Sequence, residues 1–420
     1  LNRDQQEWLA QFGWQHPPKV SVDARAVLPP WAGGGPGWVA AAWPALELSG
    51  GFSLGAFTFR GLPADSSESR FTYTNTVWNV PRLHVTHGDA RIYMDYSQND
   101  RTASYQFVVD SQWDPAEMRP LLPPGGQAGL DQVHFTGPPI IRLDIQGNWH
   151  DPARTAFDGH LAATNLVVRG QPFDAVDTDI EFSNSVIRVG PGRLALNHGQ
   201  LTVSNVDIDI SAHRVTTSNA VSTLEAESIE HALGDITPAW LLAFRFDDPP
   251  SARMNGSFVW DNPQATDLHF VVSSRNCRFT NFLADVASGS ADWIGTNVYA
   301  TNFQASMYGG TMAGWAIFEI TEHDGAGFRG DIALTNISLS ALVHGWGATS
   351  NQVEGLLSGD LVIEESNSDD TRTWRGYGNV FARDALLWDI PVFGVLSPVL
   401  NAIIPGSGNN RAYEAKADFR

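Results

Sequence analysis

Apolar and polar residues alternate at every second position over most of the chain. Val206-Asp-Ile-Asp-Ile-Ser211 is the clearest stretch, and 83–87, 201–203 and 318–320 follow the same rule. A period of two places the apolar side chains of a segment on one face of a β-strand. Short helices are expected at 4–12, 114–122, 227–233 and 338–345, and a short amphipathic helix over 390–404. We therefore predict an all-β protein with a few short helices, whose sheet must bury one apolar face.

The same landmarks return about every 110 residues. The segment Pro138-Pro139-Ile-Ile-Arg-Leu-Asp-Ile-Gln-Gly-Asn-Trp149 aligns without a gap with Pro249-Pro250-Ser-Ala-Arg-Met-Asn-Gly-Ser-Phe-Val-Trp260, 111 residues later. Asn165 and Asn276 keep the same offset. Agreement between separate landmarks on one spacing indicates a tandem repeat.

Glycines mark a tight turn in each repeat. Gly88, Gly199 and Gly309 lie between alternating stretches and are 111 and 110 residues apart. A two- or three-residue hairpin turn needs a positive φ, which glycine adopts at little cost. We expect a β-hairpin at each of the three positions. The segments 51–61 and 159–170, which both end in Arg-Gly, recur in the same way.

These landmarks divide the chain into five parts. Residues 1–16 form a leading helical segment, followed by an atypical first β-repeat with an insertion at 17–137. Two further repeats span 138–248 and 249–354, and a truncated fourth spans 355–420. Units that contact only their neighbours stack along one direction. The prediction is an elongated, curved antiparallel sheet, which leaves its concave apolar face either to a ligand or to its own side chains.

Composition narrows the classes of partner. The net charge is −20, from 26 basic and 46 acidic residues, and no basic stripe is visible. Nucleic acids and anionic membrane surfaces both require such a stripe, so neither is expected. Cys277 is the only cysteine, which excludes an intramolecular disulfide and a cysteine zinc site. No run of 18 apolar residues occurs.

Motifs that carry chemistry elsewhere are here better interpreted as structure. Gly51-Phe-Ser-Leu-Gly55 matches a hydrolase nucleophile pattern, but Ser53 lies in a predicted strand rather than at a strand–helix turn. His84 and His87 would point to opposite faces of a strand. The carboxylates of 174–181 and 207–209 fit a solvated sheet face. We predict no catalytic residues, no metal site and no cofactor.

Four segments near the end of the chain carry a family resemblance. They are Gly359-Asp-Leu-Val-Ile363, Trp374-Arg-Gly-Tyr-Gly-Asn-Val380, Asp384 to Leu400 and Ala415-Lys-Ala-Asp-Phe419. Together they resemble the C-terminal region of the AsmA-like superfamily of bacterial envelope proteins. The resemblance implies a periplasmic protein anchored to the inner membrane by an N-terminal helix outside this sequence. It also implies a hydrophobic β-groove that conducts phospholipid or another acyl lipid between membranes or supports outer-membrane assembly, with possible envelope protein partners.

The expected lipid-contact residues are the apolar positions of alternating segments. They are Ile92, Met94, Leu194, Leu196, Leu201, Val203, Val206, Ile208, Ile210, Phe318, Ile320, Leu361 and Ile363. An open face of aliphatic side chains would support lipid binding. A filled face would instead indicate a structural or scaffold protein of the envelope. A third alternative is a carbohydrate-binding or adhesive protein, which would expose some of the 15 tryptophans as platforms.

Overall fold

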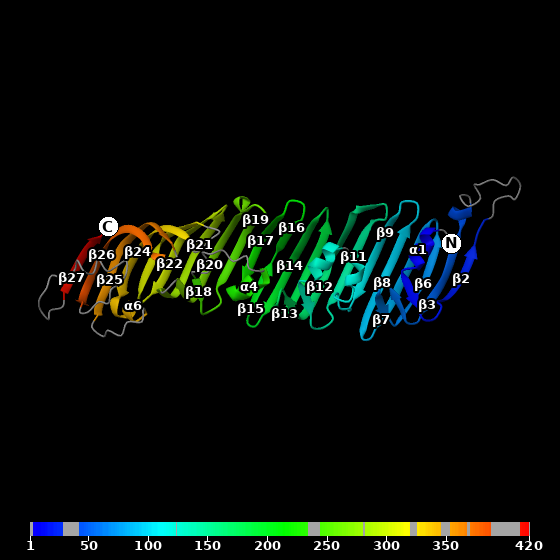
Figure 1. The fold of residues 1–420 in the computed structure, drawn as a ribbon, viewed down its shortest axis with the longest axis horizontal. Helices are drawn as coiled ribbons and strands as arrows, with labels where there is room; N and C mark the ends of the chain where they lie inside the picture. The colour runs from blue at the N-terminus through cyan, green and yellow to red at the C-terminus, as the bar shows by residue number, and fades with distance from the viewer. Residues whose placement is uncertain are drawn as a thin grey trace. The chain divides into compact units, whose positions relative to one another are not determined.

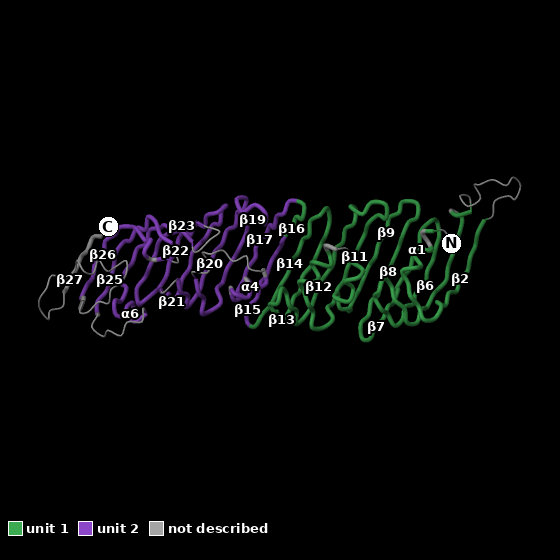
Figure 2. Tube along the Cα trace, in the orientation of Figure 1, with its two compact units in different colours: residues 1–197, 207–211 green, residues 198–206, 212–420 purple. Residues whose placement is uncertain are grey.

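The computed structural model describes residues 3–27, 42–122, 124–233, 244–279, 282–319, 326–345, 353–367, 370–387 and 412–419. Strands account for 71% of the structure and helices for 9%, which confirms the predicted all-β class with a few short helices. The strand pairs are antiparallel, as Figure 1 shows for successive strands. The chain separates into two compact units, coloured in Figure 2. Unit 1 contains residues 1–197 and 207–211, and unit 2 contains residues 198–206 and 212–420.

In unit 1, each strand of the main sheet pairs with the next one along the chain, with few exceptions. The order of neighbours is β2 (Lys19–Arg25), β3 (Glu47–Leu54), β6 (Ser66–Thr74), β7 (Val77–His87), β8 (Ala90–Asn99), β9 (Ser104–Ser111), β11 (Ile140–Asn148), β12 (Asp151–Val168), β13 (Gln171–Ser183), β14 (Val186–Leu196) and β16 (Asn205–Asp209), of which residues 207–209 belong to this unit.

Unit 2 repeats this arrangement. The order of neighbours is β15 (Gly199–Val203), β17 (Arg214–Ser222), β19 (Ser251–Val259), β20 (Asp267–Phe279), β21 (Phe282–Ile294), β22 (Asn297–Met307), β23 (Gly310–Glu319), β24 (Gly327–Ser338), β25 (Val353–Asn367), β26 (Asp370–Leu387) and β27 (Ala412–Phe419).

Paired prolines interrupt one strand of each repeat at the same place. Pro138-Pro139 separates β10 (Val133–Phe135) from β11, and both of these strands pair with the long strand β12. Pro249-Pro250 separates β18 (Phe244–Phe246) from β19 in the same way, and both pair with β20. A proline has no N–H to donate to a sheet ladder, so pairing stops there and resumes beyond it.

The first repeat contains an equivalent break that the sequence landmarks did not include. Pro17-Pro18 lies between β1 (Phe12–Trp14) and β2. β1 pairs with β4 (Phe57–Phe59), which forms a hairpin with β5 (Leu62–Ala64), so these three strands form a small separate sheet. The atypical first repeat therefore begins like the second and third.

Left-handed residues occupy matching positions in the repeats. Asn165 and Asn276 have φ values of 54° and 47°. The hairpin turns at Arg60-Gly61 and Arg169-Gly170 both have φ values of 48° and 87°, which suit a type I′ turn. Gly88 and Gly309 have the predicted positive φ, between β7 and β8 and between β22 and β23.

The prediction for the turn at Gly199 is wrong in one respect. The positive φ of 51° falls on Asn197, whereas Gly199 begins β15. A Cβ on Gly199 would lie 2.5 Å from the carbonyl oxygen of Thr223, so a close backbone approach requires this glycine. β15 itself pairs with β17.

Two of the five predicted helices form as expected, α4 (Ala226–Leu233) and α6 (Leu339–Gly345). The helix expected over 390–404 lies outside the described residues. The first, α1, spans only Arg3–Leu9, because Phe12–Trp14 is β1. The helix expected over 114–122 is absent from the described structure of that segment, which holds turns and the short 3₁₀ helix η2 (Arg119–Leu121). Pro120 explains this, since a proline inside a helix removes a hydrogen bond and clashes with the preceding turn. A short helix, α3 (Pro124–Leu130), follows.

Candidate functional site

One face of the unit 1 sheet is lined by apolar side chains. Strand register places Met94, Val109, Leu143, Gly159, Ile180 and Val189 side by side across β8, β9, β11, β12, β13 and β14. The next row consists of Tyr96, Phe107, Ile145, Phe157, Phe182 and Ile187. Neither row contains a charged residue. The side chains in both rows are only half-buried, so this face remains partly open.

The opposite face of the same strands is charged. Tyr93, Asp110, Arg142, His160 and Asp179 form one row across β8 to β13. A shallow hollow of about 890 Å³ is lined by these residues together with Asp95, Val108, Asp144, Asp158, Glu181 and Arg188, among others.

Ion pairs and hydrogen bonds engage several of the charged side chains on this face. His160 Nδ1 lies 2.9 Å from Asp179, and Arg142 lies 3.6 Å from Asp110. Arg188 binds Asp207 at 2.9 Å and Glu181 at 2.8 Å, and these two hydrogen bonds raise the pKa of its guanidinium. Exposed pairs of this kind contribute little to stability but keep the face hydrated. Water is therefore expected on this face.

Part of the unit 1 apolar face is covered by the protein itself. Leu62 and Ala64 of β5 and the fully buried Trp113 pack over Ile92, with Val85 and Met94 beside them. Trp113 also stacks on His87, with 5.6 Å between ring centroids. The rows from Leu143 to Val189 and from Ile145 to Ile187 lie outside this cluster.

The corresponding face of unit 2 is filled at two places. Val298, Phe318, Phe328 and Ile363 form one buried cluster, over which Phe244 and Phe279 pack. Leu339, Leu342 and Val343 of α6 belong to a second buried cluster with strand residues such as Ile337 and Leu357. Unit 2 thus uses much of its apolar surface for its own core.

The structure divides the expected lipid-contact residues into three groups. On unit 1, Ile92 and Met94 belong to β8, Leu194 and Leu196 to β14, and Ile208 to β16, while Ile210 follows β16 and is 47% exposed. On unit 2, Leu201 and Val203 belong to β15 and Val206 to β16, and Phe318, Leu361 and Ile363 belong to or pack against a filled cluster. Ile320 lies outside the described residues.

The aromatic row of unit 1 was missed by the sequence analysis. Phe107, Phe157 and Phe182 lie on three strands that are distant in the sequence, and only the register of β9 and β12 with their neighbours brings them together. Alternation shows that such residues share a face of their own strand. It does not show which strands are neighbours or how far each one is shifted.

The serine and histidine motifs that the sequence analysis interpreted as structural lie within paired strands. Ser53 lies within β3, paired with Lys19 on one side and Glu68 on the other, and not at a strand–helix turn. His84 stacks on Tyr93 at 4.6 Å, whereas His87 stacks on Trp113, so the two histidines do point to opposite faces. Among the described residues, no group of three or more histidine, cysteine, aspartate or glutamate side chains could hold a metal ion.

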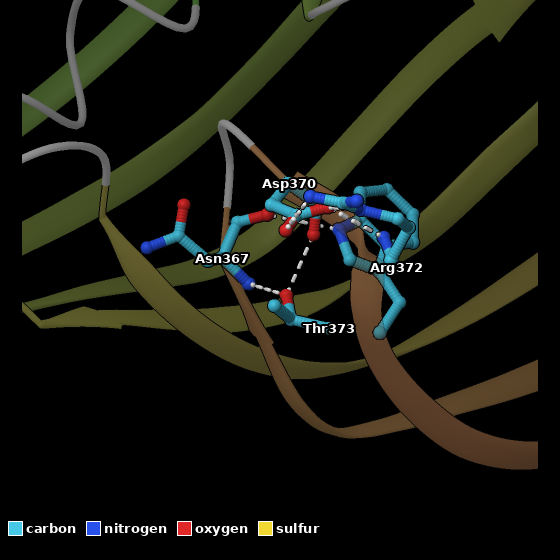
Figure 3. A network of polar contacts seen from close by, with 5 residues as sticks. Asn367, Asp370, Arg372 and Thr373 are labelled. Atoms are coloured by element: carbon cyan, nitrogen blue, oxygen red, sulfur yellow. Dashed lines mark hydrogen bonds and ion pairs between the residues drawn. The ribbon is translucent and has the colours of Figure 1, made fainter.

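A compact polar network closes the hairpin between β25 and β26 (Figure 3). Asp370 binds Arg372 through both carboxylate oxygens at 2.8 and 2.9 Å, which lowers the pKa of Asp370. Thr373 donates to the carbonyl of Asp370 at 2.7 Å and accepts from the N–H of Asn367 at 2.9 Å. These contacts satisfy the N–H of Asn367 and the carbonyl of Asp370 at the facing ends of the two strands, a role that Asp and Thr side chains have in many proteins.

No protein-family model, no curated protein and no solved structure matches this chain. Within the described part of the chain, no helix has the length and apolar character needed to cross a bilayer.

Proposed function

We propose that the chain is a non-enzymatic lipid-binding protein, whose unit 1 apolar face holds acyl chains. The observation that carries the proposal is the pair of uncharged, half-buried rows that cross β8 to β14. Monomeric proteins rarely leave a contiguous apolar patch of this kind without a partner. The charge on the opposite face supports this choice of side for an apolar ligand.

The dimensions suit an acyl chain. The four strands β11 to β14, which lie outside the covered cluster, are spaced about 4.8 Å apart and make a row roughly 15 Å long. One leaflet of a bilayer has a hydrocarbon thickness of about 15 Å, so the row matches the length of an acyl chain within one leaflet. Burial stabilises such a chain by about 0.8 kcal/mol per CH₂ group, without specific polar contacts. The aromatic row would bind acyl chains of different length and saturation with little discrimination.

The cellular setting of this function rests on the AsmA-like resemblance. We propose a periplasmic location, anchoring to the inner membrane by a segment outside this sequence, and phospholipid as the cargo. A protein with this location, anchor and cargo would move lipid between membranes or support outer-membrane assembly. An open groove along the sheet is the feature that transport would require.

A structural role is the second candidate, and the core of unit 2 favours it there. The cluster around Phe318 and Phe328 is packed by Phe244 and Phe279, so that region holds protein side chains where a groove would hold lipid. A protein with one lipid-binding unit and one packed unit would satisfy both sets of observations.

Native mass spectrometry with added phosphatidylethanolamine tests the proposal. Ile145→Asp places a charge on the apolar face, and Val108→Asp places one on the charged face, where Val108 is 44% exposed. We expect bound lipid on the wild-type chain and on Val108→Asp, and at least tenfold less on Ile145→Asp. Circular dichroism shows whether both variants fold. Equal lipid binding by both folded variants would exclude the face we describe.

A further inference from the structure

Two tryptophans, one in each unit, are held by the same kind of backbone hydrogen bond. Trp149 directly follows β11, and its backbone N–H donates to the carbonyl of Ala103 at 3.0 Å. Trp260 directly follows β19, and its N–H donates to the carbonyl of His213 at 3.1 Å. Both acceptor residues have a positive φ, of 54° and 52°. The repeat therefore preserves the backbone hydrogen bond of the tryptophan as well as the residue itself.

Both indoles are supported and nevertheless exposed. Trp149 packs on Tyr105 with 4.3 Å between ring centroids, and Trp260 packs on His213 at 5.1 Å. Trp149 remains 52% exposed and Trp260 43% exposed. Burial is what usually makes a tryptophan favourable, since the side chain can remove about 150–250 Å² from water. A ring that is fixed in place but left half in water is arranged for contact with a ligand.

The groups around both rings are hydrogen-bonding groups. The indole N–H of Trp149 donates to Gln98 at 3.1 Å, and Gln98 donates in turn to Asp100 at 2.8 Å. Beside Trp260, Asp261 binds His213 at 2.5 Å, and this hydrogen bond lowers the pKa of Asp261. The Gln98 amide, itself bound to the Asp100 carboxylate, thus lies beside Trp149, and the Asp261 carboxylate lies in the residue next to Trp260.

We infer that Trp149 and Trp260 are stacking platforms for the sugar rings of a neutral glycan. The C–H groups on one face of a pyranose carry partial positive charge and meet the negative face of an indole. Sugar hydroxyls donate to neighbouring carboxylate and amide oxygens, and such charge-assisted bonds are the stronger ones. The acidic neighbours disfavour a bilayer as the occupant, because a carboxylate is costly to bury in hydrocarbon and is repelled by anionic lipids. This inference does not depend on the proposed lipid binding.

Isothermal titration of the full chain with maltohexaose and with chitohexaose tests the inference. We expect at least one of these neutral hexasaccharides to bind at two separate sites, Trp149→Ala and Trp260→Ala each to remove one site, and the double variant to abolish binding. Trp315→Ala is the matched control, because Trp315 is similarly exposed at 44% but lies within β23, away from any turn. Its removal should leave affinity unchanged.

A second pair of substitutions separates loss of stacking from loss of folding. Trp149→Phe with Trp260→Phe keeps an aromatic ring on each support, so it should lose less affinity than the alanine pair, and melting curves show that each variant folds. Failure of both hexasaccharides to bind would overturn the inference, as would binding that survives the double alanine variant. Loss of binding to phosphatidylcholine vesicles in that variant, without any glycan binding, would overturn it in favour of a membrane contact.

Discussion

At the scale of single residues, the sheet depends on glycines that allow two backbones to approach closely. Gly159 lies in the centre of the unit 1 apolar face, and a Cβ there would be 2.1 Å from the carbonyl oxygen of Arg142. We predict that Gly159→Ala destabilises the protein by about 1–3 kcal/mol through overpacking. Gly55→Ala is the control, since nothing lies within 4 Å of its Cβ position. Urea unfolding measures both, and equal midpoints would show that the close approach is not real.

Histidine–carboxylate pairs give a prediction for pH. His269 binds Asp292 at 2.7 Å and Asp267 at 3.1 Å, and the hydrogen bond to Asp292 is the main cause of its raised pKa. A histidine whose pKa is raised on folding stabilises the protein below its ordinary pKa, and this stabilisation is lost as the pH rises through the raised value. NMR titration should therefore place the His269 pKa above 6.5, and Asp292→Asn should move it back down. No movement in that variant would assign the shift to another cause.

At the scale of elements, α6 is the helix whose packing is best defined. Leu342 and Val343 are 8% and 1% exposed and lie in the cluster with Ile337 and Leu357. Leu342→Ala should cost about 2–5 kcal/mol, the usual range for a buried leucine. Leu356→Ala, at a position 38% exposed, should cost less than about 1 kcal/mol. Thermal unfolding followed by circular dichroism compares them, and similar losses would mean that α6 does not cover the sheet.

The elements also show how far sequence reasoning extends. Alternation in segments such as 206–211 predicted strands correctly, and helical spacing predicted α4 and α6. It failed over 114–122, where Pro120 outweighs the apolar spacing. Local patterns do not predict that β10 and β11, on either side of Pro138-Pro139, both pair with β12. That arrangement follows only from the register of all three strands. The need for a positive φ in a hairpin turn predicted Gly88 and Gly309 correctly. Gly199 is required for another reason, because the carbonyl oxygen of Thr223 lies too close for a Cβ.

At the scale of the whole molecule, the repeats produce two units whose apolar sheet faces are packed to different extents. Residues expected to contact lipid were chosen from alternation alone, and those on β23 and β25 belong to or pack against a packed cluster. Which faces are filled depends on contacts between segments far apart in the sequence, such as Phe279 with Phe328. No local pattern carries that information. The unit 1 rows from β11 to β14 remain the surface on which lipid binding rests.

The most direct test places a photoreactive side chain on each face of one strand. Benzoylphenylalanine replaces Phe157, on the apolar face, or its neighbour Asp158, on the charged face, and the full chain is irradiated with phosphatidylethanolamine vesicles. Mass spectrometry then measures covalent lipid adducts. The lipid-binding account predicts adducts from position 157 and none above background from position 158. Equal labelling at the two positions, or no labelling at 157, would contradict it.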